Sequence, residues 1–252
     1  MSRIIAPEKL KNKTWFASFD VGKKNFAFCI EEFDHDFIKS NIPKLKLSDR
    51  YNENYTPSDT FNTHLNTLFS HGKILVLKNT DLTKNLEDPK KYYDSDLCHE
   101  MTELLDQYID YWNNCSGFII EQQMSFRGKI NSMALKLGQH CFSYFAVNYK
   151  RFKTIIEFPS YHKTNVLGAE RSLSYTKKGK KKWKTLGDKE RKKWAVEKAK
   201  EILELRNDDT FLPLYQPQKR KKGVRKMKLD DISDVIIQLQ AYKYLNIVAQ
   251  EL

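Results

Sequence analysis

The sequence predicts a mixed α/β fold, because short apolar runs typical of strands alternate with longer segments that carry a single apolar stripe. The clearest strand is "SGFIIEQQ", which follows a helix-like segment at residues 95–113 and precedes another at 130–147. In the first of these segments, apolar residues recur at spacings of three and four, which places them on one face of a helix. These residues are Leu97, Met101, Leu104, Leu105, Tyr108 and Trp112.

The other expected elements flank these three along the chain. Gly22 lies in "GKK" and permits a tight turn between two early strands. Residues 34–70 are polar and rich in Asn, Ser and Thr, so we expect a long irregular excursion there. The remaining elements are strands at 15–21, at 25–32, from Lys73 and at 153–158, a basic helix that includes Trp194, and an amphipathic helix from Leu229.

The composition favours a nucleic-acid partner. The 252 residues include 44 Lys and Arg against 32 Asp and Glu, a formal charge of +12, and such an excess attracts polyanions and releases their counterions. No apolar segment is long enough to span a bilayer, and the N-terminus lacks the apolar core of a signal peptide, so we expect an intracellular protein without a membrane partner. The four cysteines form no C-x-x-C pair or Cys/His cluster, which indicates reduced packing residues rather than a zinc site or disulfides.

Acidic residues stand at three informative places. Asp20 lies in a strand-like apolar run, Glu121 ends the central strand, and Asp231 and Asp234 open the last helix. Taken singly, each has an ordinary explanation: an acid bonded to its own hairpin turn, a strand-end acid in solvent, or a helix cap. Capping accounts for Asp230 or Asp231 but not for Asp234, which lies one turn further on the same face. Taken together, they predict carboxylates gathered at one edge of a sheet, where divalent cations neutralise them.

These features predict a metal-dependent phosphodiesterase that acts on nucleic acid, and three segments also carry a family resemblance. "SFDVGKKNFAFCI", "GFIIEQQMSFRGKINSMALKLGQ" and "KLDDISDVIIQLQAY" resemble the acidic motifs of the RuvC-type Holliday-junction resolvases, closest to the branch of poxviruses, related large DNA viruses and fungal mitochondria. The resemblance implies an RNase H-like fold with a five-stranded mixed sheet flanked by helices, and a homodimer that acts on four-way DNA. We expect one nuclease domain over residues 1–252, which departs from the family by extra sequence near 34–70 and a lysine-rich insertion at about 171–228.

Position by position, the resemblance assigns the site residues. The metal-binding and catalytic acids are Asp20, Glu121, Asp231 and Asp234, and "PSYHKTNVLG" resembles the segment that bears a basic residue in the family, which points to Lys163. We expect two Mg²⁺ ions, with Mn²⁺ able to substitute: a water activated at one ion attacks the phosphorus, and the other stabilises the departing 3′ oxygen. Lys163 then offsets charge on the pentacovalent phosphate. The residues expected to contact DNA are Lys23, Lys24, Arg127, Lys129, Lys180, Lys181 and Lys182.

Several alternatives stay open. The same fold and acids serve nucleases for other branched DNA or RNA/DNA hybrids and strand transferases, and a non-catalytic basic DNA-binding module would carry the same charge. The lysine-rich region is either a solvated charge run or a DNA contact. A viral protein would act at cytoplasmic replication sites, and otherwise we expect the mitochondrion or the nucleus. The apolar helix at 130–147 is either part of a dimer contact or core of its own subunit, through Met133, Leu137, Cys141, Phe142 and Phe145.

Overall fold

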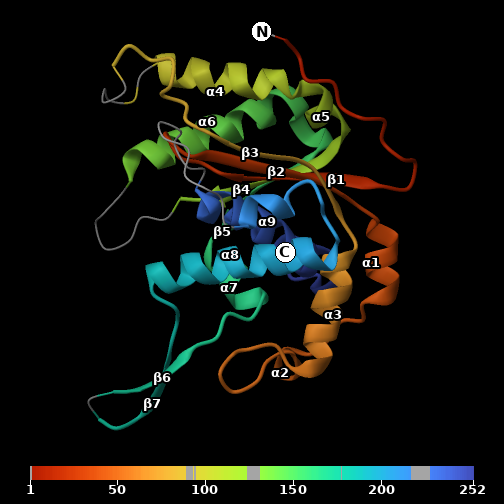
Figure 1. The fold of residues 1–252 in the computed structure, drawn as a ribbon, viewed down its shortest axis with the longest axis vertical. Coiled ribbons are helices and arrows are strands. Elements are labelled where there is room, and N and C mark those ends of the chain that lie inside the picture. The colour runs from red at the N-terminus through yellow and green to blue at the C-terminus, as the bar shows by residue number, and fades with distance from the viewer. Residues whose placement is uncertain (1, 89–92, 94, 124–130, 177, 217–227) are drawn as a thin grey trace.

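A five-stranded mixed sheet forms the centre of the computed structural model, which describes residues 2–88, 93, 95–123, 131–176, 178–216 and 228–252 (Figure 1). The order across the sheet is β3-β2-β1-β4-β5. β2 pairs antiparallel with both β1 and β3, whereas β1, β4 and β5 run parallel, which is the RNase H-like arrangement. The predicted fold class is therefore confirmed. The strands are β1 (Thr14–Asp20), β2 (Phe26–Phe33), β3 (Lys73–Thr80), β4 (Cys115–Gln122) and β5 (Thr154–Pro159).

Helices cover both faces of the sheet, each over its own apolar core (Figure 1). On one face lie α4 (Ser95–Gln107), α5 (Ile109–Asn114) and α6 (Ser132–Tyr149). On the other face lie α1 (His35–Asn41), α3 (Asp59–Ser70), α7 (Tyr161–Val166), α8 (Asp188–Leu205) and α9 (Leu229–Lys243). Smaller elements are α2 (Leu47–Arg50), the hairpin strands β6 (Ser172–Tyr175) and β7 (Lys181–Lys184), 3₁₀ turns at Lys150–Phe152 and Leu212–Tyr215, and a π-helical turn at Tyr244–Ala249.

The predicted strands and long helices are present, with two local differences. The helix expected over 95–113 is divided into α4 and α5, because Tyr108 leaves the helical conformation (φ −104°, ψ 15°). The turn between the first two strands is a loop of residues 21–25 rather than a tight turn. Gly22 is still favoured there, since a Cβ atom at this position would lie 3.0 Å from the carbonyl oxygen of Asn25, which is closer than an ordinary van der Waals contact.

The segment 34–70 corrects the prediction of an irregular excursion. It folds into α1, α2 and α3, and the hydroxyl of Ser58 accepts a hydrogen bond from the backbone N–H of Phe61, which caps α3. Phe61, Leu65 and Leu68 form a buried stripe on α3 that packs against the α9 side of the sheet. Three or four residues separate these apolar positions, so the helical signal was present but diluted by the intervening Asn and Thr.

Three of the five apolar residues that the sequence singles out in α6 pack into their own subunit, and a part of this helix in a dimer contact stays a prediction. Leu137, Cys141 and Phe145 are 0% exposed, and the ring of Phe145 stacks on Phe118 of β4 with centroids 3.9 Å apart. The other two residues of that set, Met133 and Phe142, are half-buried against the same core. Leu137, Cys141 and Phe145 are therefore core residues, as expected for a helix that follows a central strand.

The four cysteines are free thiols, and three of them contribute to the core. Cys29, Cys115 and Cys141 are buried, and Cys98 is half-buried. The ranges that the structure describes contain no helix long and apolar enough to cross a membrane.

A buried charged cluster ties α8 and α9 to β2. Glu31 of β2 is fully buried, and its Oε1 lies 2.9 Å from Nη2 of Arg206 and 2.6 Å from Nζ of Lys243. Gln240 of α9 donates to the other oxygen of Glu31 at 2.7 Å. Burial opposes the charged carboxylate, but Arg206 and Lys243 outweigh that effect and lower the pKa of Glu31. The carboxylate therefore stays charged and joins three elements of the fold.

We expect Glu31→Gln to lower the free energy of unfolding by roughly 3–5 kcal/mol, because it leaves two buried cations without their anion. Urea denaturation at neutral pH measures this loss. Glu204→Gln, on the exposed face of α8 beside Lys200, is the matched control and should cost less than about 1 kcal/mol.

The pH dependence provides a second test of the same cluster. Because the folded-state pKa of Glu31 is lowered, its stabilisation is fully present above the ordinary value of 4.5 and is lost as the pH falls through the lowered value. The stability gap between wild type and Glu31→Gln should therefore narrow below pH 4.5. A gap that stays constant under acid would contradict the assigned ion pairs.

Candidate active site

Asp20 and Glu121 lie side by side at the carboxyl ends of two parallel strands. In the register of β1 and β4, Phe19 stands opposite Ile120, and each acid is the next residue along its strand. Successive side chains of a strand point to opposite faces, and Phe19 and Ile120 both pack into the core on the α6 side. Asp20 and Glu121 therefore project from the other face of the sheet, which α9 covers.

Gln238 fixes the position of α9 over these strands. Its Nε2 donates to Oγ of Ser18 at 3.0 Å and to the carbonyl oxygens of Phe19 and Ile119 at 3.2 Å each. Asp234 lies one helical turn before Gln238 and on the same face of α9. The buried amide thus places Asp234 over the ends of β1 and β4, beside the two strand acids.

The ammonium group of Lys163 lies among these acids. Lys163 belongs to α7, which begins directly after β5, the strand next to β4. Its Nζ is 3.1 Å from Oε1 of Glu121 and 3.3 Å from Oδ1 of Asp234, and its side chain is only 5% exposed. Burial alone would lower the pKa of Lys163, but the carboxylates of Glu121, Asp234 and Asp20 outweigh it and raise that pKa. The lysine is therefore held as a buried cation.

Negative charge exceeds positive charge in this cluster. Burial raises the pKa of Asp20 well above its usual value, and the neighbouring charges of Glu121, Asp234 and Asp231 raise it further, against the opposing effect of Lys163. Burial also raises the pKa of Asp234, where Lys163 again opposes and Glu121 adds. One ammonium group thus faces several carboxylates, and an additional cation would be attracted to them.

Asp231 lies at the border of the cluster and has partners of its own. Asn79 of β3 donates from Nδ2 to Oδ2 of Asp231 at 3.2 Å, and Nζ of Lys228 is 4.0 Å from the same oxygen. The neighbouring Asp230 pairs instead with Lys192 of α8 at 2.7 Å. Sequence reasoning missed Asn79 and Lys192, because one Asn at the end of a strand and one lysine among many carry no signal of their partners.

The carboxylate oxygens of this cluster are ligands of the type that a hard divalent cation binds. Carboxylate oxygens are the ligands that Mg²⁺ prefers in proteins, and Asp20, whose charged form is disfavoured here, is a carboxylate that a cation would stabilise. Within the described ranges, no three Asp, Glu, His or Cys side chains are grouped closely enough to hold a metal ion as they stand. Two of these carboxylates, those of Glu121 and Asp234, pair with Lys163 instead.

The residues predicted to contact DNA fall in two described places. Lys23 and Lys24 lie in the loop between β1 and β2, where Lys24 is exposed and Lys23 is half-buried. Residues 180–182 belong to the β6–β7 hairpin and its turn, and all three side chains are exposed. Arg127 and Lys129 lie outside the described residues.

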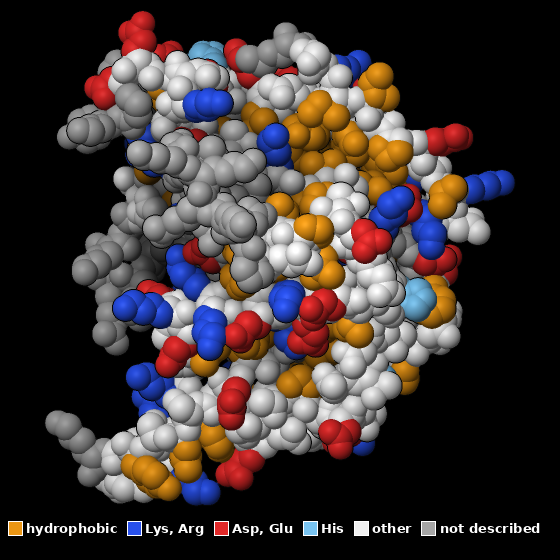
Figure 2. Space-filling view, in the orientation of Figure 1, with side chains coloured by type: hydrophobic (Ala, Val, Ile, Leu, Met, Phe, Trp, Pro, Cys, Tyr) orange, Lys and Arg blue, Asp and Glu red, His pale blue; other side chains and the backbone are white. Residues whose placement is uncertain are grey.

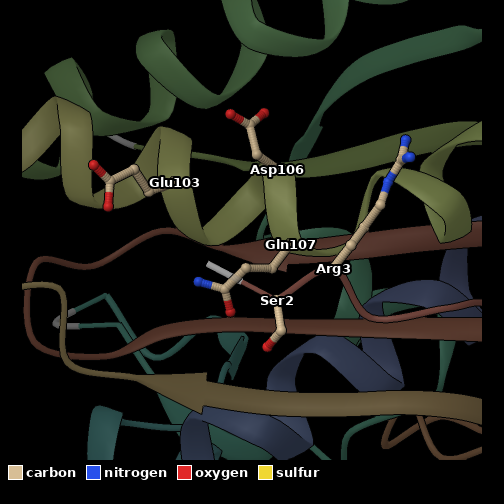
Figure 3. Close-up of a pocket in the computed structure, with 5 residues that line it drawn as sticks. All are labelled: Ser2, Arg3, Glu103, Asp106 and Gln107. Atoms are coloured by element: carbon tan, nitrogen blue, oxygen red, sulfur yellow. The ribbon is translucent and has the colours of Figure 1, made fainter.

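A separate hollow lies between the N-terminal segment and α4 (Figure 3). Its lining residues are Ser2, Arg3, Glu103, Asp106 and Gln107. The helix α4 covers the face of the sheet opposite α9, so this hollow is not continuous with the carboxylate cluster.

Comparison with known sequences finds two relatives that align along nearly the whole chain. Uncharacterized protein 170L of Invertebrate iridescent virus 6 is 34% identical over an alignment of 258 positions that covers 94% of this chain and 92% of 170L. The chain belongs to the family of protein 170L. Another relative of the 170L family, uncharacterized protein 97L of Invertebrate iridescent virus 3, is 29% identical over 231 residues, or 90% of this chain and 98% of 97L. No protein-family model matches the chain.

Three solved structures are similar to this member of the 170L family. The fowlpox virus Holliday junction resolvase is 16% identical with a TM-score of 0.44, over 91% of this chain and 96% of its own. RuvC of Thermus thermophilus is 10% identical with a TM-score of 0.44, over 93% and 98%. The yeast mitochondrial Holliday junction resolvase Ydc2 is 15% identical with a TM-score of 0.43, over 94% and 86%.

We expect Asp20→Asn to stabilise the metal-free protein by about 1 kcal/mol, because it removes a carboxylate whose charged form is disfavoured in the folded state. The folded-state pKa of Asp20 is raised, so wild type loses stability as the pH rises from 3.8 through the raised value. The Asn variant should lack this loss. Denaturation in EDTA across this pH range measures it, with the exposed Asp209→Asn as the control.

Thermal melting with added Mg²⁺ tests cation binding without any substrate. A cation that binds only the folded state raises the melting temperature, so Mg²⁺ should stabilise wild type and the Asp209→Asn control, but not Asp20→Asn. Equal Mg²⁺ responses in all three proteins would place the cation elsewhere.

Proposed function

We propose that this protein is a metal-dependent endonuclease that resolves four-way DNA junctions by paired hydrolysis of phosphodiester bonds. The main support for the proposal is that Asp20, Glu121 and Asp234 lie close to Lys163 at one edge of the sheet. The four residues come from two strands and two helices. These residues are far apart in the sequence, and a packing role alone would not require several acids at one place.

Each residue of the cluster has a role in the proposed reaction. Asp20, Glu121, Asp231 and Asp234 hold the metal, for which two Mg²⁺ ions, or Mn²⁺ in their place, are the proposed cofactor. When bound, Mg²⁺ supplies Lewis-acid stabilisation of the attacking and leaving oxygens of a phosphodiester. Lys163 keeps its proton and offsets negative charge that develops on the phosphate. The products then carry 5′-phosphate and 3′-hydroxyl ends.

The substrate assignment combines charge with the motif resemblance. A net charge of +12 suits nucleic acid, and Lys23 and Lys24 lie close to the carboxylates in sequence, where they could contact phosphates. The order of the three acidic motifs supports a RuvC-type resolvase that works as a homodimer on branched DNA. The same proposal takes residues 1–252 as one nuclease domain with a lysine-rich insertion at about 171–228, acting at cytoplasmic viral replication sites.

We expect Asp20→Asn, Glu121→Gln and Asp234→Asn each to lower the cleavage rate of a labelled four-way junction by at least about 100-fold, with little change in junction binding. Each change removes a ligand charge from the metal site but leaves the phosphate contacts in place. Asp230→Asn is the matched control, because this neighbouring acid pairs with Lys192 instead, and it should cut at nearly the wild-type rate. Two ligand variants that cut as fast as Asp230→Asn would refute the assignment.

The same assay separates the proposed function from its alternatives. Four-way junctions, flaps and RNA/DNA hybrids offered side by side identify the preferred substrate, and a hybrid cut faster than the junction would favour an RNase H-like activity. Binding that is tight but indifferent to Mg²⁺, with no cleavage of any substrate, would indicate a non-catalytic DNA-binding module.

We expect a dimer in sedimentation at micromolar concentration, because a four-way junction offers two symmetry-related strands and paired cuts require one carboxylate cluster for each. The contact must use a surface other than Leu137, Cys141 and Phe145, which are buried within one subunit. A wild-type monomer that still makes paired, symmetric cuts would exclude a preformed dimer.

A further inference from the structure

The lysine-rich region contains an ordered hairpin that protrudes below α7 and α8 (Figure 1). β6 and β7 pair antiparallel through the whole of both strands, from Ser172 opposite Lys184 to Tyr175 opposite Lys181. The backbone N–H of Thr176 donates to the carbonyl of Lys180 at 2.9 Å beyond the last pair, next to a turn in which Gly179 has a φ of +72°. This part of the region is therefore a β-ribbon and not a structureless charge run.

The two faces of the hairpin differ in chemistry. In an antiparallel pair, opposite residues share a face, and so do residues two apart on one strand. One face therefore consists of Leu173, Tyr175, Lys181 and Trp183, and we call it the aromatic face. The other face consists of Ser172, Ser174, Lys182 and Lys184, and we call it the serine–lysine face.

Part of the aromatic face contacts the body of the protein, through Trp183 and Lys181, whereas Leu173 and Tyr175 of the same face are exposed. The ring of Trp183 meets Tyr55 edge-on with centroids 6.2 Å apart, and the guanidinium of Arg171 lies 3.6 Å above the same Tyr55 ring. Nζ of Lys181 is 3.5 Å from Oε1 of Glu53. These contacts anchor the hairpin to the loop before α3, so the serine–lysine face points away from the body.

The lysines of the serine–lysine face differ from those of the neighbouring helix. In α8, Lys193, Lys198 and Lys200 each pair with a glutamate three or four residues along the helix. Figure 2 shows this mixture of Lys, Arg, Asp and Glu side chains over α8. Lys182 and Lys184 are exposed and have no acidic partner in the part of the chain that is described. Their charge is available to an external anion.

Both ends of the hairpin connect to elements that carry residues of the carboxylate cluster or its border. β6 follows α7, which carries Lys163, and β7 leads through residues 185–187 into α8, where Lys192 pairs with Asp230 beside Asp231. The ribbon spans about 13 Å along its four-residue strands, and Lys182 and Lys184 are about 7 Å apart. That separation matches about two base-pair steps of 3.4 Å along one DNA strand.

We propose that the serine–lysine face of the hairpin binds the phosphate backbone of the duplex arm that leads away from the carboxylate cluster. This inference rests on the proposed function for the identity of the polymer. Lys182 and Lys184 contact two phosphates of one strand that lie about two base-pair steps apart, and the hydroxyl of Ser172 lies beside them as a donor. Lys181, which sequence reasoning placed with Lys182, serves the anchor on the opposite face instead.

The test is the salt dependence of binding to a four-way junction in EDTA, which does not require cleavage. Lys182→Gln/Lys184→Gln should lower affinity about tenfold and reduce the slope of log K against log salt by about two, since each phosphate contact contributes about 0.9. Lys39→Gln/Lys73→Gln is the matched control, because it removes the same charge from exposed positions of α1 and of the far end of β3. Its slope should stay within about half a unit of wild type.

The outcomes separate this inference from the proposed function. Equal slopes for the two double variants, or a larger effect of Lys181→Gln than of Lys182→Gln, would overturn the hairpin assignment even if the protein cuts junctions. Conversely, if the slopes change as expected but no substrate is cleaved, the hairpin is supported as a DNA contact and the proposed nuclease activity is contradicted.

Discussion

The position of α9 over the ends of β1 and β4 depends on the buried amide of Gln238. A buried amide N–H group is costly unless it is hydrogen-bonded, and Nε2 of Gln238 has its three acceptors on two different strands, β1 and β4. The helix cannot slide along the sheet or turn about its axis without losing these bonds. The helical repeat then determines the position of Asp234, which lies one turn from Gln238 and over the strand ends that carry Asp20 and Glu121.

The two ends of α9 differ in how well their buried charges are balanced. At its C-terminal end, Glu31 is matched by two cations, Arg206 and Lys243, so the buried charges compensate one another. At its N-terminal end, within the described ranges, Glu121 and Asp234 share the ammonium of Lys163. Burial, together with these neighbouring carboxylates, raises the pKa of Asp20. The ion pairs of Glu31 stabilise the C-terminal end of the helix. The carboxylates at the N-terminal end can therefore keep an excess of negative charge that attracts a cation. Such an arrangement lowers stability in return for binding, which is common where a site must attract a ligand.

Sequence patterns predicted the strands of the sheet and the acidic residues of the site, because both follow from repeats between residues that are close in the sequence. A two-residue alternation puts Asp20 and Glu121 on one face, and a 3.6-residue repeat puts Asp231 and Asp234 on one side of the last helix. Lys163 came from the family resemblance, since nothing in six-residue α7 marks it. The helices of 34–70 were missed because polar residues dilute their stripes. Asn79 could not be found at all, because its bond to Asp231 joins residues 152 positions apart.

Composition predicted a polyanionic partner but could not distinguish one lysine from another. Pairing in space makes that distinction, since α8 neutralises many of its own lysines at helical spacing while Lys182 and Lys184 remain unpaired within the described ranges. The result is an electropositive ribbon joined by short connections to an electronegative cluster. A phosphate chain is attracted by the first and repelled by the second, so it can enter the cluster only when cations neutralise the carboxylates. For a substrate of this kind, anchoring on the ribbon and cation binding at Asp20, Glu121 and Asp234 are therefore coupled, and DNA bound without metal should rest on the ribbon rather than in the cluster.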